Sequence, residues 1–231
     1  MILEVRAVAP FFKNGFVVGS ERTRDAIMID PGDEADQLVD AARQHSLTVR
    51  YVLLTHAHVD HITGVALAKS ACQAPVYLHK DDLPFYDRAV QQGQMFGLVV
   101  EQPPPVDKFY DGSPILFGDY EVHIHHTPGH CPGGVCLEIR AVGEGGRGEG
   151  EGRKGREGTH LFVGDTLFAG SIGRTDLPGG NYDVLMRSIT EVLIPLGEDA
   201  IVHPGHGPDT TIGRERKTNP FVAEYLASKH G

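Results

Sequence analysis

Four potential metal ligands follow one another almost without a break in the segment Thr55-His56-Ala57-His58-Val59-Asp60-His61, which holds three imidazoles and one carboxylate. Neutral imidazole suits zinc, iron and manganese, whereas a carboxylate is a hard, anionic ligand that can bridge two cations and offset their repulsion. Because only positions three or four apart share a face of a helix, we expect this segment to be a loop that gathers its side chains around a metal ion.

Three further candidates each stand beside glycine at the end of a strand-like run: His130, Asp165 and His206. One such residue alone is more often a turn or cap residue than a ligand, since turns tolerate Asp and His. Four strand ends that all carry such residues instead favour a site for two metal ions. The candidate ligands are therefore His56, His58, Asp60, His61, His130, Asp165 and His206.

The first ligand segment lies between residues 49–54, whose apolar run predicts a buried strand, and residues 62–72, which show a helical pattern. Ligand sites of α/β proteins open at the carboxyl ends of strands, because the connecting loops gather there. The patterning therefore predicts an α/β fold with the site at strand ends. Further strands are expected before residue 30 and at 75–79, 114–126, 135–140 and 160–163, helices at 33–45, 80–92, 181–193 and 219–229, and an extended loop at 95–111.

Length and charge limit the class of protein. The 231 residues suit one catalytic domain, 1–231, with a glycine-rich surface insertion at about 143–158. The formal charge of −10 and the lack of a basic stripe argue against nucleic acid as a partner. We expect a cytoplasmic location and no membrane association, because the sequence shows neither a leader-like start nor an apolar run long enough to span a bilayer.

The three cysteines form no framework of paired spacings, so we expect them to be reduced. Cys131 directly follows His130, which raises a ligand role as one interpretation. The other is a small buried residue in a tight loop, and it is favoured because the His/Asp set already fills two coordination spheres. The remaining histidines are expected to be core or surface residues: His79, His123, His125, His126, His160 and His203.

These segments resemble those of the metallo-β-lactamase superfamily over almost the whole chain. Within it, the sequence is most similar to short bacterial proteins of the hydroxyacylglutathione hydrolase (glyoxalase II) type. Gly164-Asp165-Thr166-Leu167-Phe168 followed by Gly173-Arg174 is similar to the segment around their bridging aspartate, and Ile29-Asp30-Pro31-Gly32 resembles an early strand-end turn. The resemblance implies an αββα sandwich of two mixed β-sheets with helices on the outer faces.

By that resemblance, Asp165 would bridge two metal ions, of which His56, His58 and His130 hold the first and Asp60, His61 and His206 the second. A hydroxide between the cations would exist at neutral pH and attack a carbonyl carbon. The cations would keep Asp60 and Asp165 ionised at this catalytic centre. The expected metal is zinc, with iron or manganese as alternatives. The implied substrate is a small-molecule thioester, such as the glutathione conjugate S-D-lactoylglutathione.

Three residues outside the ligand set are also candidates for the site. Thr55 and Asp30 could hydrogen-bond the ligand imidazoles, although Asp30 could equally cap its own turn. Arg174 is the candidate for binding an anionic substrate, because guanidinium pairs with a carboxylate in bidentate fashion; an ordinary surface role is the alternative. Glyoxalase II has an aromatic residue where this chain has Asp176, and its longer members carry a C-terminal helical domain beyond the position of His206. These departures favour a thioester hydrolase over a dedicated glutathione enzyme.

Other functions stay open at the level of sequence. The persulfide dioxygenase branch of the superfamily uses a single iron, held by residues equivalent to His56, His130 and Asp165. A hydrolase of another ester, lactone or thioester would use the same centre, and a non-catalytic member would bind a partner through a vestigial site. A β-lactamase is disfavoured, because that role usually goes with export and with a Cys or Ser in part of the His/Asp pattern.

Overall fold

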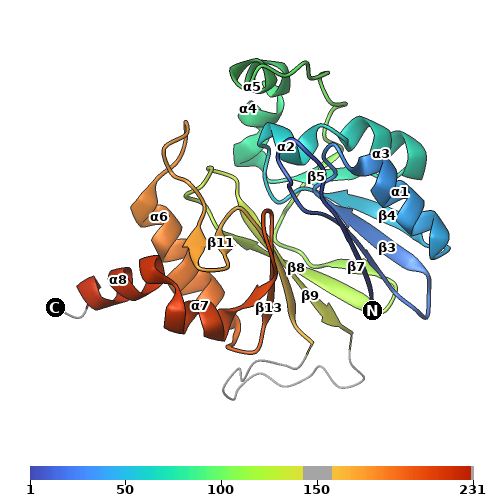
Figure 1. The fold of residues 1–231 in the computed structure, drawn as a ribbon. Helices are drawn as coiled ribbons and strands as arrows, with labels where there is room; N and C mark the ends of the chain where they lie inside the picture. Colours follow the sequence, from blue (N-terminus) through green and yellow to red (C-terminus); the bar gives the residue numbers. More distant parts are fainter. Residues whose placement is uncertain (143–157, 230–231) are drawn as a thin grey trace. The chain divides into compact units, whose positions relative to one another are not determined.

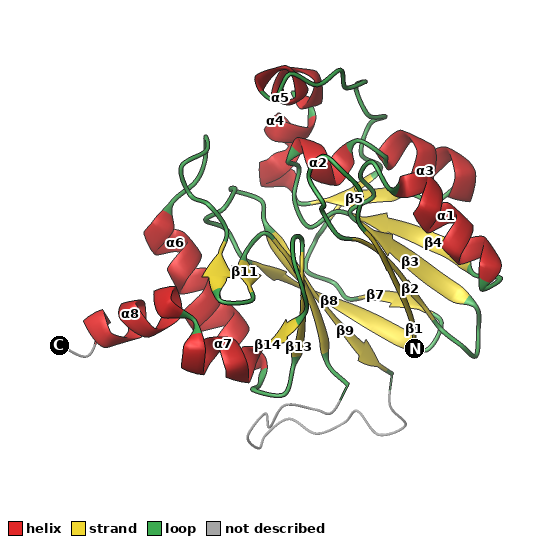
Figure 2. Cartoon of the chain, viewed as in Figure 1, coloured by secondary structure: helices red, strands yellow, loops and turns green. Residues whose placement is uncertain are grey.

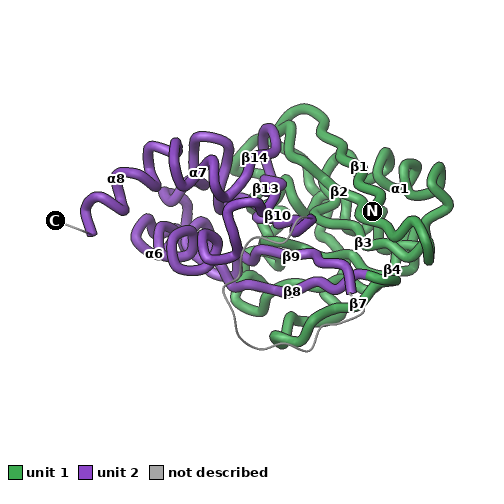
Figure 3. The backbone as a smooth tube through the Cα atoms, turned by 90° about the horizontal axis from the view of Figure 1, so that it is seen from below, with its two compact units in different colours: residues 1–119 green, residues 120–231 purple. Residues whose placement is uncertain are grey.

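The computed structural model describes residues 1–142 and 158–229 and divides into two compact units, Met1–Asp119 and Tyr120–Gly231 (Figures 1 and 3). Each unit holds a mixed β-sheet with helices packed on it. The single domain expected over 1–231 stays a prediction. The expected glycine-rich insertion lies outside the described residues, apart from Gly158 at its end.

The sheet of the first unit has the strand order β1-β2-β3-β4-β5-β6. Its first two pairings are antiparallel and the other three are parallel, so β3, β4 and β5 end at the same edge. This confirms the strand-rich start of the chain and the strand predicted before the ligand segment. The strands of this unit are β1 (Ile2–Arg6), β2 (Gly15–Gly19), β3 (Asp25–Ile29), β4 (Thr48–Leu53), β5 (Val76–Leu78), β6 (Lys108–Phe109) and β7 (Ile115–Phe117).

Two helices, α1 (Ala35–Gln44) and α3 (Val65–Cys72), cover this sheet (Figure 2). The apolar residues of α1 recur at helical spacing, so Leu38, Val39 and Ala42 face the strands together. Burying each large side chain contributes about 1.5–3 kcal/mol, which is what holds the helices to the strands. The smaller helices of the unit are α2 (Val59–Ile62), the 3-10 helix η1 (Lys80–Asp82), α4 (Leu83–Tyr86) and α5 (Ala89–Met95).

The expectation that the whole ligand segment is a loop is wrong at its end. Asp60 and His61 belong to α2, which is followed at Gly64 by a break before α3. A Cβ on Gly64 would collide with the carbonyl oxygen of Gly32, so the chain can pass there only as glycine. A single helix over 62–72 was therefore also wrong, because this close approach separates two helices.

The continuous helix predicted for 80–92 is likewise wrong. The segment forms η1, α4 and α5 in succession, with a turn at Asp87 and Arg88. Pro84 lies at the start of α4, where its missing N–H costs nothing, but it prevents η1 and α4 from forming one regular helix. The extended loop predicted for 95–111 is interrupted by β6, which adds an edge strand to the sheet.

The sheet of the second unit runs β14-β13-β10-β9-β8. The predicted strand pair on either side of the glycine-rich segment is confirmed, since β9 and β10 pair antiparallel. β10 and β13 are parallel, which places Asp165 and His206 after strand ends on the same edge. The strands are β8 (Tyr120–His126), β9 (Val135–Ala141), β10 (His160–Gly164), β11 (Leu167–Phe168), β12 (Ser171–Ile172), β13 (Ile201–Pro204) and β14 (Thr210–Thr211).

A helical layer covers one face of this second sheet. The predicted helix at 181–193 starts where Asn181 caps it by accepting the N–H of Val184 at 3.0 Å, and its second half is wound as a π-helix. The helix α7 was not expected, because its sequence Ile212-Gly213-Arg214-Glu215-Arg216 shows little apolar periodicity. The helices are α6 (Tyr182–Arg187), the π-helix η2 (Ser188–Leu193), the 3-10 helix η3 (Ile194–Leu196), α7 (Ile212–Thr218) and α8 (Pro220–Lys229).

None of the helices within 1–142 and 158–229 is both long enough and apolar enough to cross a membrane.

Candidate metal centre

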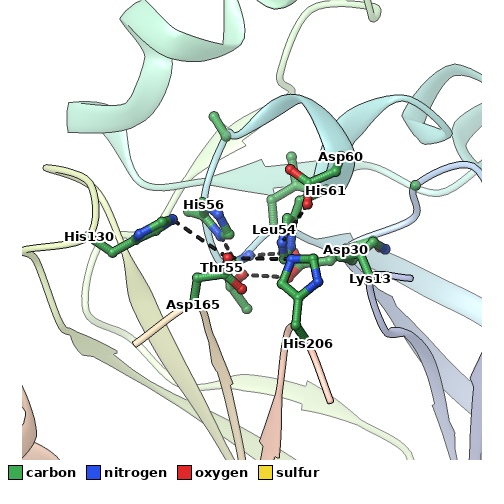
Figure 4. Close-up of polar contacts among 12 residues, drawn as sticks. Lys13, Asp30, Leu54, Thr55, His56, Asp60, His61, His130, Asp165 and His206 are labelled. Atoms are coloured by element: carbon green, nitrogen blue, oxygen red, sulfur yellow. Dashed lines mark hydrogen bonds and ion pairs between the residues drawn. The ribbon is translucent and has the colours of Figure 1, made fainter. Parts of the chain in front are cut away.

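The first group of candidate ligands lies just beyond the carboxyl end of β4 in the first unit (Figure 4). His56 and His58 belong to the loop that leaves the strand, while Asp60 and His61 lie in α2. The ring centroid of His56 is 4.9 Å from that of His58 and 4.0 Å from that of His61. Nε2 of His61 is 3.6 Å from Oδ2 of Asp60. The structure therefore gathers the three imidazoles and the carboxylate of this segment.

Asp30, directly after β3, ties this group to the sheet. Its Oδ1 accepts the backbone N–H of Thr55 at 2.6 Å, and its Oδ2 accepts the hydroxyl of Thr55 and the Nδ1–H of His61, the latter at 3.0 Å. The residue is 1% exposed and has a φ of 49°, in the left-handed region that Asp tolerates better than most residues. The carboxylate thus bonds to the ligand segment rather than to its own turn.

These bonds also fix which nitrogen of each imidazole carries the proton. The single proton of the Thr55 hydroxyl goes to Asp30, so the contact of 3.1 Å between Thr55 Oγ1 and His56 Nδ1 has the imidazole as donor. His61 likewise donates from Nδ1 to Asp30. In both rings Nε2 then carries the lone pair, which is the form that a metal ion requires.

Three side chains that the sequence did not single out hold the loop in place. Asp82 accepts the N–H of Ala57 at 2.8 Å, and Gln92 donates to the Ala57 carbonyl at 2.9 Å. Tyr110 donates its hydroxyl to the Leu54 carbonyl at 3.1 Å. Burial, reinforced by the negative charge of Asp30, raises the pKa of Tyr110 well above its usual value, so this donor keeps its proton. Asp82 ends the polar run His79-Lys80-Asp81-Asp82, so no local sequence signal indicated these supports.

The second group of candidate ligands belongs to the second unit and centres on Asp165 (Figure 4). Its Oδ2 is 3.7 Å from Nε2 of His130 and 3.5 Å from Nε2 of His206. Asp165 follows β10 and His206 follows the parallel β13, so strand register brings them together. His130 donates from Nδ1 to the backbone carbonyl of Arg174 at 2.8 Å, which again leaves Nε2 with the lone pair.

Two glycines allow the backbones of this group to approach one another. A Cβ on Gly173 would collide with the Asp165 carbonyl oxygen and lie 3.3 Å from Nδ1 of His130. Gly129, with a φ of 129°, packs against the backbone of Leu185 at the start of a helix. Close packing therefore requires glycine at both positions. Gly173 lets its loop lie against Asp165 and His130, and Gly129 lets the loop before His130 lie against Leu185.

Arg174 is placed with its main chain against His130 and its guanidinium in solvent. The guanidinium makes a bidentate pair with Asp176, through two bonds of 2.7 Å, and its side chain is 56% exposed. The hydrogen bonds from Arg174 lower the pKa of Asp176 to about 2, so this partner is ionised at neutral pH. The residue predicted to bind an anionic substrate thus already pairs with a carboxylate of its own chain.

His160 and His203 were predicted to be core or surface histidines, and they lie in the neighbouring strands β10 and β13. The two rings stack with centroids 5.2 Å apart, and Nδ1 of His160 is 2.9 Å from Nε2 of His203. His203 also packs on Phe162 and lies 3.0 Å from the carboxylate of Asp209. Burial and then the neighbouring imidazole lower the pKa of His160 to about 4. Cys131 is buried, as is its neighbour His130, and its non-ligand role stays a prediction.

The donor atoms of both groups fit divalent metal ions. Nδ1 of His56, His61 and His130 is each bonded to a protein acceptor, which directs the Nε2 lone pairs to a metal. The nitrogen–oxygen separations of 3.5–3.7 Å exceed hydrogen-bond lengths. They lie close to the roughly 3.3–3.6 Å expected for two ligands held tetrahedrally at about 2.0–2.2 Å from one zinc ion. A mixed imidazole and carboxylate set suits zinc, iron or manganese.

Comparisons with known proteins agree with this geometry. A family model described as "Metallo-beta-lactamase superfamily" matches residues 8–143 and 155–206. The chain is 32% identical over 230 residues to hydroxyacylglutathione hydrolase GloC of Haemophilus influenzae, covering 96% of this chain and 98% of that protein. It is 38% identical to TTHA1623, solved in a di-iron-bound form, with a TM-score of 0.77 and coverage of 94% and 99%. It is 33% identical to the BLEG-1 B3 metallo-β-lactamase, with a TM-score of 0.82 and coverage of 96% and 99%.

Replacing Asp30 by Asn should weaken metal binding. The amide keeps the shape and the left-handed backbone, but it loses the charge and turns one acceptor into a donor that faces Thr55 or His61. Loss of such a partner of a ligand imidazole costs about 10- to 100-fold in metal affinity. Competition for Zn²⁺ with a chromophoric chelator measures the effect, with the exposed Asp36→Asn as control. Equal affinities of Asp30→Asn and wild type would contradict the assigned hydrogen bonds.

The stability of the metal-free protein should fall as the pH is lowered from about 6.5 to about 4. Because the pKa of His160 is about 4 in the folded protein and near 6.5 when unfolded, the unfolded chain binds more protons in this window, so acid favours unfolding. Urea unfolding in the presence of a chelator measures this slope. His160→Asn should flatten it between pH 4 and 6.5 and leave it unchanged above pH 7. A slope equal to that of wild type throughout would refute the assignment.

Proposed function

Because this chain belongs to the metallo-β-lactamase superfamily, we propose that it is a binuclear metallohydrolase of the glyoxalase II type that cleaves a small-molecule thioester. Membership confirms the resemblance and the fold class inferred from the sequence, two mixed β-sheets with helices packed on them. The observation that carries the proposal is the fixed tautomer of His56, His61 and His130, since three separate Nδ1 hydrogen bonds prepare Nε2 for metal binding.

The proposed ligand set assigns the first metal ion to His56, His58 and His130, the second to Asp60, His61 and His206, and the bridge to Asp165. When bound, two cations would supply a water molecule deprotonated near neutral pH, and positive charge for the oxyanion that develops on the carbonyl oxygen and for the thiolate that leaves. Zinc is the proposed metal. Iron stays an alternative, because the related TTHA1623 was solved in a di-iron-bound form.

The protein's own residues contribute orientation and charge. Asp82 fixes the loop that carries His56. Asp30 and Thr55 hold the rings of His56 and His61 in one orientation. The backbone carbonyl of Arg174 does the same for His130. With these side chains locked before substrate binds, little reorganisation is needed during the reaction.

The thioester substrate is proposed from the relatives and from the surface around Arg174. GloC is named for a glutathione thioester, and the chain matches nearly all of it. Asp176 occupies the Nε–Nη2 edge of the Arg174 guanidinium, so a substrate carboxylate that pairs with the remaining edge would lie beside the negative charge of Asp176. A thioester with little negative charge in the part that faces Arg174 is therefore the preferred substrate over a glutathione thioester.

A β-lactam is the second candidate substrate. The BLEG-1 enzyme is a B3 metallo-β-lactamase with a TM-score of 0.82 over nearly the whole chain, and attack on a lactam carbonyl needs the same centre. Turnover of a thioester and of a chromogenic β-lactam by the same preparation separates the two candidates.

The function is tested by metal analysis of the purified protein together with turnover of S-D-lactoylglutathione and of an uncharged acyl thioester. We expect two metal equivalents and hydrolysis of both, with the uncharged substrate preferred. His58→Ala should lower kcat/KM by more than about 100-fold, beyond the loss caused by removing an outer partner of a ligand. His45→Ala, which changes a partly exposed histidine of the same unit that pairs with Glu4, is the control. A fully active His58→Ala enzyme, or oxygen uptake with glutathione persulfide in place of hydrolysis, would overturn the proposal.

Arg174 and Asp176 should affect anionic and neutral substrates differently. Asp176→Asn releases the guanidinium and should lower KM for S-D-lactoylglutathione about two- to fivefold, a small effect because a solvent-exposed ion pair contributes little. Arg174→Ala should raise that KM more than it lowers kcat, because the lost contact is made equally before and during the reaction. Steady-state kinetics on the two thioesters measures both effects, with exposed Arg43→Ala as control. An unchanged KM in both variants would remove Arg174 from substrate binding.

A further inference from the structure

A lysine lies buried beside the turn that presents Asp30. Lys13 is 2% exposed, and it is the one buried lysine or arginine within residues 1–142 and 158–229. Its ammonium donates to the backbone carbonyl of Asp30 and to the carboxylate of Glu34, which is itself buried. Figure 4 shows Lys13 next to Asp30. A buried charge is unfavourable unless it is paired. We therefore expect the ammonium of Lys13 to provide something here that an apolar side chain would not.

The role of the Lys13–Glu34 pair follows from the backbone groups that the two side chains bind. Asp30 has a left-handed backbone, which is less stable for a non-glycine residue than the ordinary regions and persists only where its surroundings enforce it. The ammonium of Lys13 donates a hydrogen bond to the Asp30 carbonyl, while Glu34 accepts the N–H of Gly32 at 3.0 Å. The two side chains thus bind both ends of the turn Asp30-Pro31-Gly32.

Two glycines show how closely the pair is fitted to this turn. A Cβ on Gly15 would collide with the carboxylate of Glu34. A Cβ on Gly32 would lie 2.9 Å from Cε of Lys13 and would collide with the backbone carbonyl of Asp60. The turn is therefore packed between the lysine and the helix that carries two candidate ligands, with no room for either to shift.

We infer that Lys13 and Glu34 are positioning residues of the metal centre, which act through Asp30 to hold His56 and His61 in their metal-binding orientation. The inference rests on the proposed ligand set. Lys13 fixes the Asp30 main chain, the Asp30 carboxylate fixes Thr55 and His61, and Thr55 fixes His56. Neither Lys13 nor Glu34 touches a metal ligand side chain in this chain of contacts.

The pairing also explains why a cation is tolerated near a metal site. Lys13 alone would repel a divalent ion, whereas the Lys13–Glu34 pair is neutral and adds no net charge. Removing only one partner would leave an unpaired buried charge. A single substitution therefore cannot separate the effect of that charge from the effect of losing the hydrogen bond that positions Asp30. The double variant Lys13→Met/Glu34→Gln stays neutral and similar in volume, but it lacks the ammonium that grips the Asp30 carbonyl.

The test measures Zn²⁺ affinity by chelator competition at 25 °C, on variants whose folding is verified by circular dichroism. Lys13→Met/Glu34→Gln should bind Zn²⁺ at least tenfold more weakly than wild type, and Glu34→Asp, which keeps both charges but shortens the acceptor, should show a smaller loss. Lys69→Met, which removes a partly exposed ion pair with Asp107 in the same unit, is the matched control and should bind as wild type does.

Wild-type affinity in a folded double variant would overturn the inference. If the double variant does not fold, Glu34→Asp decides in its place, and unchanged affinity there would overturn it equally. A wild-type protein that binds Zn²⁺ tightly but cleaves no thioester would refute the proposed function without affecting this result. A merely structural role would lower the melting temperature and leave the affinity of the folded protein unchanged.

Discussion

The carboxylate of Asp30 is the constraint on which the arrangement of the candidate ligands in the first unit depends. It accepts three donors from the segment after β4, and it can do so because β3 and β4 are parallel and end side by side, with the N–H of Asp30 bonded to the Leu53 carbonyl at 3.1 Å. The left-handed backbone at Asp30 aims the side chain at that segment. Sheet topology, one unusual φ and one ionised side chain together define the orientation and the proton position of two imidazoles.

The second unit reaches the same result by different means. His130 is oriented by a backbone carbonyl, that of Arg174, and not by a carboxylate. A carbonyl can serve only where the loop that carries it is fixed, and Gly173 provides this because no side chain separates the loop from Asp165. In the first unit the carboxylate of Asp30 orients the imidazoles directly. In the second unit close packing at Gly173 fixes the loop whose carbonyl orients His130.

Much of this arrangement could be predicted from the sequence, because ligand residues at strand ends are a local signal. Asp30 and Thr55 were recognisable for the same reason. Lys13, Asp82 and Gln92 were not, since each acts on residues far away in the chain and has ordinary polar neighbours in sequence. The helix at Asp60 was missed because spacing rules describe isolated helices, while α2 is a single turn held by its surroundings.

Charge explains why the first unit is built to receive a cation. Its buried acids are Asp30, Glu34 and Asp82, and its one buried lysine or arginine among the described residues is Lys13. Since imidazoles that present Nε2 lone pairs are neutral, the interior of this unit carries an excess of negative charge beside them. Buried charge of one sign is unfavourable until it is compensated, and a divalent ion bound by these imidazoles compensates it. Metal binding and folding are then linked, because an ion that binds only the folded chain stabilises it by mass action. The hydrogen bonds that orient the candidate ligands are thereby the same ones that would couple metal binding to the stability of the fold.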